Sequence, residues 1–371
     1  MSDLSEEIAN AQRLVKTDAY QMSIGEIVSM YENGELIIDP EFQRLFRWKS
    51  EQKSRLIESL LLGIPLPSIF VFERNDGTWE LIDGLQRLST VLEFMGKLRR
   101  PEGGLGVPSL LEGTKYLPSL HNTVWERSEL IVDVPVTEQL ELSKVQQLSL
   151  RRSRIGVEIL KRPSDDQTKF DLFQRLNAGG TQANAQELRN CIMLMVNGTY
   201  YRAVRAAAEQ EIFQTVTGIS EDQIERQRHM EYAVRFLVHA EVPYDGTLDV
   251  EEYIDDGIVK LAAHSDGSAD RSLIDRTFTL LNAVAGKDAL RRFEDGHYTG
   301  KVSLIGLEAI AVGVAKNLEG IMAQPEPQLF VSERIKRFWQ QPKVESFTSP
   351  GLRGTTRIQR TVPFGADWFR P

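Results

Sequence analysis

The residues best suited to chemistry in this sequence form the run Asp83-Gly84-Leu85-Gln86-Arg87. The guanidinium group of Arg87 could donate two parallel hydrogen bonds to a phosphate, and Gly84 would let the backbone approach a ligand closely. A strand is expected to end and a helix to begin at this run, and the unpaired N–H groups of a helix N-terminus bind anions. An ordinary capping turn has the same features, so the run alone leaves both a binding site and a structural turn open.

Two other segments carry an arginine next to amide side chains or glycines: Gln43-Arg44, shortly before Trp48, and Arg175 and Asn177, before Gly179-Gly180. Arg44 could bind a phosphate, or it could lie at the surface or bridge to the core. Arg175 and Asn177 could close a pocket over phosphates, or they could belong to a capped helix end with an exposed arginine. With Asp83, Gly84 and Arg87, these residues make up the predicted phosphate-binding set.

The segments around these residues alternate between helix and strand patterns. Ser23 and Glu26 form a capping box, which predicts a helix that ends at Asn33-Gly34. The patterns that follow predict strands at 36–38, 69–73, 78–82, 129–136 and 154–160, and helices at 50–62, 84–96 and 137–150. Residues 100–128, rich in Gly and Pro, are expected to form an irregular insertion. This alternation predicts a small α/β domain.

From Asn184 onward, the sequence is helical almost to its end. The predicted helices are 185–196, 201–215, 221–239, 250–264, 272–285, 303–318 and 329–340. The predicted fold class is therefore α+β. It comprises a small α/β domain at 1–163, a mostly helical domain at 164–330 and a basic C-terminal segment at 331–371.

The composition is that of an ordinary globular protein, with 371 residues of which 41% are hydrophobic and 26% charged. The longest apolar runs are far shorter than the roughly 20 residues of a membrane-spanning helix. The acidic N-terminus does not fit a secretory signal. We therefore predict a cytoplasmic protein with no membrane partner. The single cysteine, Cys191, cannot form an internal disulfide and is expected to be an inert core residue.

The net charge of −9 argues against a protein whose whole surface binds nucleic acid. The charge is uneven, however, because residues 331–371 contain eight Lys/Arg and three Asp/Glu, a net +5, and the other 330 residues carry −14. This basic segment could bind DNA locally, or it could dock on the acidic remainder of the chain.

The sequence lacks the residues of a self-contained nuclease. Its histidines are His121, His229, His239, His264 and His297. They are too scattered for a His-Asn-His nuclease, and no restriction-type Asp…Glu-x-Lys spacing is found. A Walker A loop, a zinc-binding Cys/His spacing and a serine nucleophile elbow are also missing from the sequence. A separate effector protein is therefore an expected partner.

Four motifs in chain order carry a family resemblance. They are Pro-x-Phe-Gln-Arg-x-x-x-Trp at 40–48, Leu-Ile-x-Ser-x-Leu-x-Gly-x-Pro at 56–65, Asp-Gly-x-Gln-Arg-Leu at 83–88, and Phe-x-Arg-Leu-Asn-x-Gly-Gly at 173–180 with Glu-Leu-Arg-Asn at 187–190. Through them, residues 23–190 resemble the ParB-like DGQQR-motif family. That family forms the N-terminal domain of GmrSD-type modification-dependent restriction enzymes and of phosphorothioation-sensing defence proteins.

The resemblance implies a ParB/sulfiredoxin-like fold that binds a nucleoside triphosphate with Mg²⁺ and in some members hydrolyses it. By their places in the motifs, Arg44 and Arg87 would hold phosphates, and Asp83 would serve the metal or the attacking water. Gln43, Gln86 and Asn177 would orient the ligand. The resemblance thus makes Asp83, Gln86 and Arg87 the catalytic candidates. ParB-like domains often pair, so a homodimer is a further implied state.

Leu85 departs from the family pattern, because it replaces the first glutamine of Asp-Gly-Gln-Gln-Arg. It falls on the apolar stripe of the predicted helix, so the change favours packing over a polar contact and bears on hydrolysis more than on binding. Two functions remain open. The first is a nucleotide-binding component of defence against foreign or modified DNA, with slow NTP hydrolysis as an open activity. The second is a DNA- or protein-binding regulatory module with a non-catalytic pocket.

Overall fold

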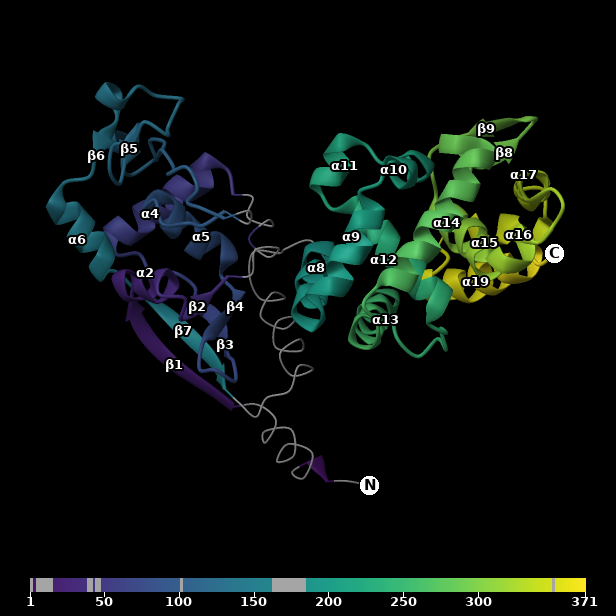
Figure 1. The fold of residues 1–371 in the computed structure, drawn as a ribbon, viewed down its shortest axis with the longest axis horizontal. Helices are drawn as coiled ribbons and strands as arrows, with labels where there is room; N and C mark the ends of the chain where they lie inside the picture. The colour runs from purple at the N-terminus through teal and green to yellow at the C-terminus, as the bar shows by residue number, and fades with distance from the viewer. Residues whose placement is uncertain are drawn as a thin grey trace. The chain divides into compact units, whose positions relative to one another are not determined.

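A computed structural model describes residues 3–4, 16–38, 43, 48–100, 103–161, 185–348 and 351–371. The chain divides into two compact units, Met1–Gln182 and Ala183–Pro371. The first unit combines a sheet with helices, and the second is mostly helical (Figure 1). This confirms the α+β fold class. The domain boundary predicted after residue 163 lies outside the described residues. Within the described ranges, no helix is long and apolar enough to cross a membrane.

A mixed five-stranded sheet forms the centre of the first unit. Its strands, in spatial order, are β1 (Lys16–Ser23), β7 (Arg154–Lys161), β3 (Ile69–Glu73), β4 (Trp79–Asp83) and β2 (Leu36–Ile37). The pairs β1–β7 and β3–β4 are antiparallel, whereas β3–β7 and β2–β4 are parallel. The helices α2 (Ile24–Glu32), α4 (Ser50–Leu62), α5 (Leu85–Phe94) and α6 (Lys144–Arg152) gather on one side of this sheet in Figure 1.

Local residues explain where the helices of this unit begin and end. At the start of α2, the hydroxyl of Ser23 accepts a hydrogen bond from the Glu26 N–H at 3.2 Å, as the capping box predicts. Gly63 ends α4 with a φ of 71°, a left-handed conformation that glycine adopts at little cost. The apolar faces of α2, α4 and α5 bury side chains such as Ile27, Ile57 and Leu92. The predictions for these helices and for the β3–β4 hairpin are confirmed.

Two parts of the first unit differ from the sequence prediction. The edge strand β1 was not predicted, because most of its residues are exposed and lack the alternation of a half-buried strand; its pairing with β7 defines it. The strand predicted at 129–136 does not form. Instead, β5 (Thr123–Val124) pairs with β6 (Leu140–Glu141), and α6 begins only after Ser143, whose hydroxyl accepts from the Gln146 N–H.

The second unit is a helical assembly. Its helices are α8 (Ala185–Val196), α9 (Gly198–Ala208), α10 (Glu211–Thr217), α11 (Glu221–Glu225), α12 (Arg228–Glu241), α13 (Val250–His264), α14 (Ser268–Ala285), α15 (Val312–Lys316), α16 (Leu318–Met322), α17 (Pro327–Phe338), α18 (Pro342–Glu345) and α19 (Gly354–Trp368). A hairpin of β8 (Arg292–Glu294) and β9 (His297–Thr299) and a π-helical turn, η4 (Gly306–Ala311), complete it.

Several predicted helices of this unit are divided in the structure. The helix predicted at 201–215 is α9 and α10, and the one predicted at 221–239 is α11 and α12. Gly218, with a φ of 63°, ends α10, and Gln227, with a φ of 60°, precedes α12. The hairpin and α19 were not predicted. Cys191 is buried, as expected.

Residues 331–371 were predicted as a separate basic segment. Its described parts, 331–348 and 351–371, pack into the core of the second unit. Phe338 of α17 and Phe369, just after α19, are both fully buried. Close contact between α19 and η4 depends on Gly365, where an added Cβ would lie 2.1 Å from the carbonyl oxygen of Ala309. The segment is therefore part of the helical fold.

Candidate functional site

The predicted ligand site lies where β4 passes into α5. Asp83 is the last residue of β4, and Gly84 precedes α5 with a φ of 99°. Opposite Asp83, the pairing of β3 with β4 shifts register between Phe70 and Val71. A bulge of this kind re-aims side chains at a strand end. The first N–H groups of α5, a helix of ten residues, have no intrahelical acceptor and point out of its N-terminus.

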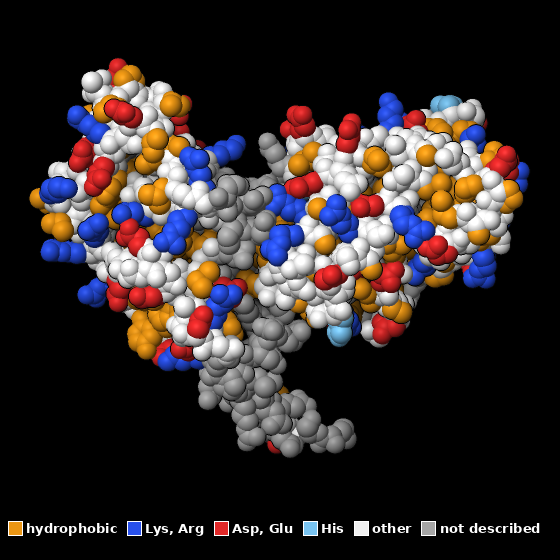
Figure 2. Space-filling model, viewed as in Figure 1, with side chains coloured by type: hydrophobic (Ala, Val, Ile, Leu, Met, Phe, Trp, Pro, Cys, Tyr) orange, Lys and Arg blue, Asp and Glu red, His pale blue; other side chains and the backbone are white. Residues whose placement is uncertain are grey.

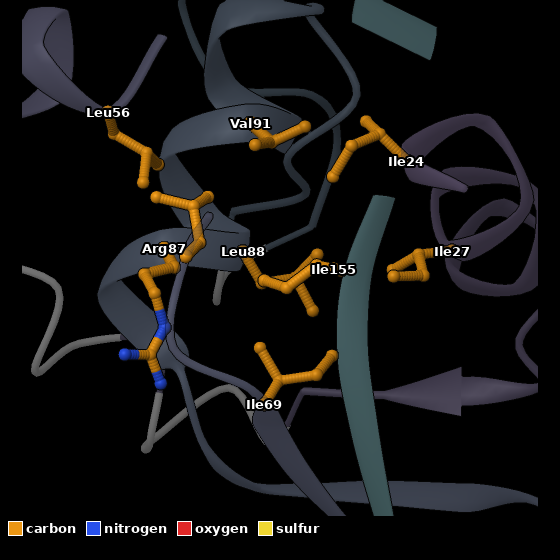
Figure 3. A pocket seen from close by; sticks show the side chains of 9 residues that line it. Ile24, Ile27, Leu56, Ile69, Arg87, Leu88, Val91 and Ile155 are labelled. Atoms are coloured by element: carbon orange, nitrogen blue, oxygen red, sulfur yellow. The ribbon is translucent and has the colours of Figure 1, made fainter. Parts of the chain in front are cut away.

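Arg87 lies in the first turn of α5 and is fixed at two points. One of its Nη atoms donates to the Asp83 carboxylate at 3.0 Å and to the Ser68 carbonyl at 3.1 Å. Its side chain is 17% exposed, and its Nε is buried with no hydrogen-bond partner among the described residues. Figure 3 shows its guanidinium group pointing away from the aliphatic side chains that flank its stem. The charged group is therefore oriented, with donor capacity left over.

The cavity beside Arg87 does not accommodate a nucleotide. It is lined by aliphatic side chains such as Leu56, Ile69 and Ile155, and its volume is about 10 Å³ (Figure 3). That space holds no more than a single water molecule. A phosphate would have to reach Arg87 from the other side of the guanidinium group.

Gln43 and Trp48 each form a hydrogen bond with a residue in or after α5. The backbone N–H of Trp48 donates to the side-chain oxygen of Gln86 at 3.1 Å. Gln43 is 9% exposed, and its amide donates to the backbone carbonyl of Arg99, just after α5. Through its side-chain oxygen, Gln86 anchors the backbone at Trp48.

The other predicted site residues, Arg44, Arg175, Asn177, Gly179 and Gly180, lie outside the described residues. Of the predicted set, the structure therefore brings together Asp83, Gly84 and Arg87, with Gln86 tied to Trp48. Arg87 and Gln43 also donate to the backbone carbonyls of Ser68 and Arg99. These two acceptors could not be predicted from the sequence, because every residue has a backbone carbonyl. Leu85 is 7% exposed, as its place on the apolar stripe predicts.

Gly84 is required by both its conformation and its neighbours. An added Cβ would lie 2.4 Å from the Ile69 Cγ2 atom, and the φ of 99° is strained for any other residue. We expect Gly84→Ala to lower the free energy of unfolding of the first unit by about 2–3 kcal/mol, measured by chemical denaturation.

Gly77 provides the control for this substitution. Its φ is 83°, but no atom lies within 4 Å of its would-be Cβ. Gly77→Ala should therefore cost only the conformational strain, about 1 kcal/mol. Equal losses in the two variants would contradict the close contact with Ile69.

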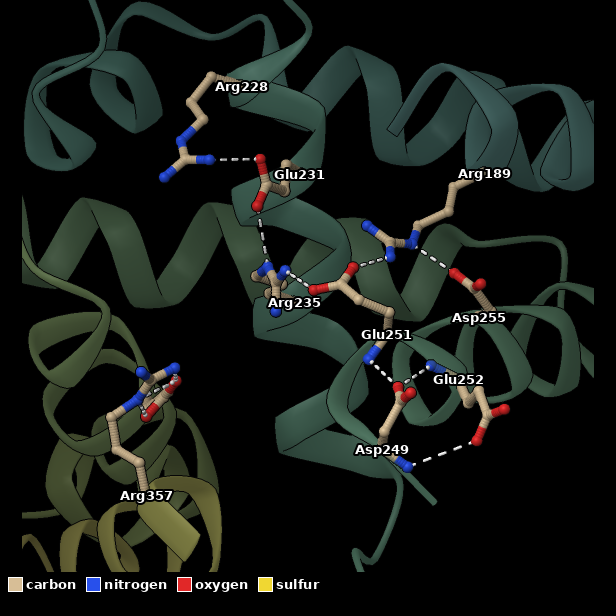
Figure 4. Close-up of polar contacts among 10 residues, drawn as sticks. Arg189, Arg228, Glu231, Arg235, Asp249, Glu251, Glu252, Asp255 and Arg357 are labelled. Carbon is tan, nitrogen blue, oxygen red and sulfur yellow. Dashed lines mark hydrogen bonds and ion pairs between the residues drawn. The ribbon is translucent and has the colours of Figure 1, made fainter. Parts of the chain in front are cut away.

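Arg189 and Asn190, which end the last motif of the resemblance, have a structural role in the second unit. Arg189 is 2% exposed and pairs with both Glu251 and Asp255 of α13 (Figure 4). Arg235 of α12 also pairs with Glu251, at 2.7 Å, so one carboxylate joins two arginines. Burial acts to raise the pKa of Glu251, but Arg235 and Arg189 together hold that pKa below its usual range. The neighbouring Asn190 bonds to the side chains of two further buried amides, Gln186 and Gln227.

No group of three or more His, Cys, Asp or Glu side chains is arranged to hold a metal ion within the part of the chain that the structure describes. A single carboxylate with substrate phosphates commonly binds Mg²⁺. Asp83 is the carboxylate that fits this mode. Its side chain is 31% exposed, and one of its two oxygens pairs with Arg87.

A comparison with protein families matches residues 24–194 to the family described as "GmrSD restriction endonuclease, N-terminal domain". The match begins at α2, covers the described elements of the first unit apart from β1, and ends within α8. Searches of the curated proteins and of the solved structures gave no match. Residues 24–194 of this chain are therefore similar to the N-terminal domains of GmrSD restriction endonucleases.

Proposed function

We propose that the first unit binds a nucleoside triphosphate with Mg²⁺ at the N-terminus of α5, as the nucleotide-binding part of a restriction-type defence system. The family supports the defence role. The observation that carries the binding site is Arg87, whose guanidinium group is oriented by Asp83 and Ser68 at the N-terminus of a helix. A helix N-terminus and an oriented arginine both favour phosphate.

Arg87, Gly84 and Asp83 would each contribute to ligand binding in a different way. Arg87 would donate to a phosphate oxygen with the N–H groups that Asp83 and Ser68 do not use. Gly84 keeps the space in front of the helix N-terminus free of a side chain. Asp83 would contact Mg²⁺ directly or through water, while its pairing with Arg87 keeps both charges in place.

Binding, rather than hydrolysis, is the activity that these contacts favour. Leu85 is buried in the core, so it offers no polar group to a reacting phosphate or an attacking water. Gln86 uses its side-chain oxygen on the backbone of Trp48. We therefore propose that nucleotide binding acts as a signal to a separate effector that cuts DNA.

Titration of the purified chain with ATP, GTP, CTP and UTP plus Mg²⁺ tests this function. A ligand present at 100 times its dissociation constant should add about 2.7 kcal/mol of stability, which is seen as a higher melting temperature. Phosphate release, measured in parallel, distinguishes binding from hydrolysis. Absence of a shift with all four nucleotides would refute the proposed site.

Replacement of Arg87 gives a sharper test. Because a charge-assisted hydrogen bond contributes about 1.5–3 kcal/mol, Arg87→Ala should weaken triphosphate binding about 10- to 100-fold in calorimetry. Arg87→Lys keeps the positive charge but lacks the planar guanidinium group that donates two parallel hydrogen bonds. It should therefore restore only part of the lost affinity.

Arg55→Ala is the matched control. Arg55 is 69% exposed and pairs with Glu51 on the surface of α4, so its removal should leave the affinity unchanged. Equal affinities of the wild type and the Arg87→Ala variant would exclude Arg87 as a ligand-binding residue.

DNA binding by the basic C-terminal segment has weaker support, because many of its cations are engaged within the second unit. Arg357 pairs with the buried Glu308 at 2.8 Å. Arg370 pairs with Asp367 at 2.9 Å, and Arg334 stacks on Phe330 and Trp368. These contacts favour docking of the segment on the protein.

A further inference from the structure

A cavity of about 360 Å³ opens in the second unit, outside the residues matched to the family. Its lining residues come from the turn that joins α10 to α11, the helices α11 and α12, and the chain on either side of the β8–β9 hairpin. Its walls include Ser220, Gln223, Tyr232, Lys287, Arg291 and Lys301. The volume falls within the roughly 300–1,000 Å³ of small-molecule sites.

The charge of this cavity is unusual for the chain. Lys287, Arg291 and Lys301 line it, and no lining residue is acidic. Lys287 and Lys301 are exposed, and neither forms an ion pair with any described residue. The whole chain has a net charge of −9, and the visible face of each unit intersperses cationic with acidic side chains (Figure 2). A concave surface lined by positive charges raises the local concentration of anions.

Arg291 provides an oriented donor at the base of this cluster. Its Nε donates to the carbonyl of Gly300 at 2.7 Å, and its Nη1 pairs with Asp288. These contacts fix the guanidinium group but do not use all of its N–H donors. An arginine held in this way loses little further freedom when it binds an oxyanion.

Uncharged groups complete the cavity. The side-chain oxygen of Gln223 accepts from the backbone N–H of Ser220 at 3.1 Å, which leaves the amide NH₂ to donate. Tyr232 is 8% exposed, and the guanidinium carbon of Arg228 lies 5.0 Å from the centre of its ring. The result is a rigid aromatic wall beside cationic and amide donors.

We propose that this cavity is a second ligand site, which binds the phosphate of a nucleic acid or of a free nucleotide. Arg291 is the fixed donor, and Lys287 and Lys301 supply the charge that the phosphate neutralises. The alternative is that both lysines are ordinary solvated surface residues. The site lies in the second unit, so its test is independent of the nucleotide site at α5.

The test compares two double variants of the full chain that lose the same charge. Lys287→Ala/Lys301→Ala removes the cavity lysines. Lys343→Ala/Arg360→Ala removes two exposed cations of the basic C-terminal segment. Binding of a fluorescent 20-base-pair DNA duplex is followed by anisotropy at several salt concentrations, and binding of ATP and of inorganic pyrophosphate by calorimetry.

The cavity variant should bind the duplex at least tenfold more weakly, and its plot of log K against log salt should be shallower by about 2. The control should stay within twofold of the wild type. A loss for ATP and pyrophosphate, but not for the duplex, would assign the phosphate to a free nucleotide. Equal losses in both double variants, unchanged binding of all probes, or a wild type that binds none of them would overturn the proposal.

Discussion

Replacement of Arg189 by methionine is expected to lower the free energy of unfolding of the second unit by about 3 kcal/mol, because it removes a buried arginine that pairs with two carboxylates. Arg189 is 2% exposed, and its partners Glu251 and Asp255 lie on α13. Methionine keeps much of the volume but leaves the two carboxylates without this partner. Burial raises the pKa of Asp255 in spite of Arg189. Most of the lost stability should therefore come from leaving the Asp255 carboxylate without this arginine.

Hydrogen exchange of the α8 and α13 amides would measure the effect within the second unit, because the tryptophans of the chain report on both units. Arg276→Met is the control, since Arg276 pairs with Glu319 at exposures of 47% and 81% and should contribute less than about 1 kcal/mol. Combining Arg189→Met with Asp255→Asn should recover part of the loss. A loss no larger than that of the control would show that the network does not stabilise the unit.

The elements that could be predicted from the sequence are those with local signals. The Asn75-Asp76-Gly77 turn predicts the β3–β4 hairpin, and the spacing of Leu88, Val91 and Leu92 predicts α5. Asp83, Gly84 and Arg87 lie close together because β4 ends at Asp83 and Arg87 belongs to the first turn of the helix that follows. Both the elements and their junction depend on residues that are neighbours in sequence.

The features that the sequence did not predict depend on distant partners. β1 is held as a strand by β7, which is more than 130 residues away in the chain. The cavity cations Lys287 and Lys301 come together because the β8–β9 hairpin folds back between them. Local patterns carry no information about such pairings.

The motif at 187–190 shows that a family pattern can mark a structural position. In the sequence, Arg189 and Asn190 follow the Gly179-Gly180 pair and complete the last family motif. In the structure, Arg189 binds two carboxylates of α13, and Asn190 bonds to two buried amides. Gln86 is similar, because its side chain fixes the backbone at Trp48. Within the described residues, Arg87 is the motif residue with the clearest spare donor capacity.

The second large effect is expected from pH, through His239. This side chain is 1% exposed, stacks on Tyr253 with ring centres 5.6 Å apart, and has no hydrogen-bond partner for either ring nitrogen among the described residues. Burial lowers its pKa to about 3, and the positive charges of Arg235, Arg357 and Lys316 act in the same direction. The folded protein therefore keeps His239 neutral.

The sign of the pH dependence follows from the proton that only the unfolded chain binds. An unfolded histidine has a pKa near 6.5, so above that pH both states are neutral and His239 adds no pH dependence. As the pH falls from about 6.5 toward 3, the unfolded state gains a proton that the native state does not take up. Stability should then fall by about 1.4 kcal/mol per pH unit, or about 5 kcal/mol over the whole window.

Denaturation of the wild type and of His239→Phe between pH 7.5 and 5 would isolate this contribution, because the other titrating groups are common to both proteins. Phenylalanine preserves an aromatic ring beside Tyr253 and cannot be protonated, so the wild type should lose about 2 kcal/mol more than the variant over this range. If wild type and His239→Phe lost stability in parallel, His239 would have to be protonated in the folded state, which its burial beside three cations opposes.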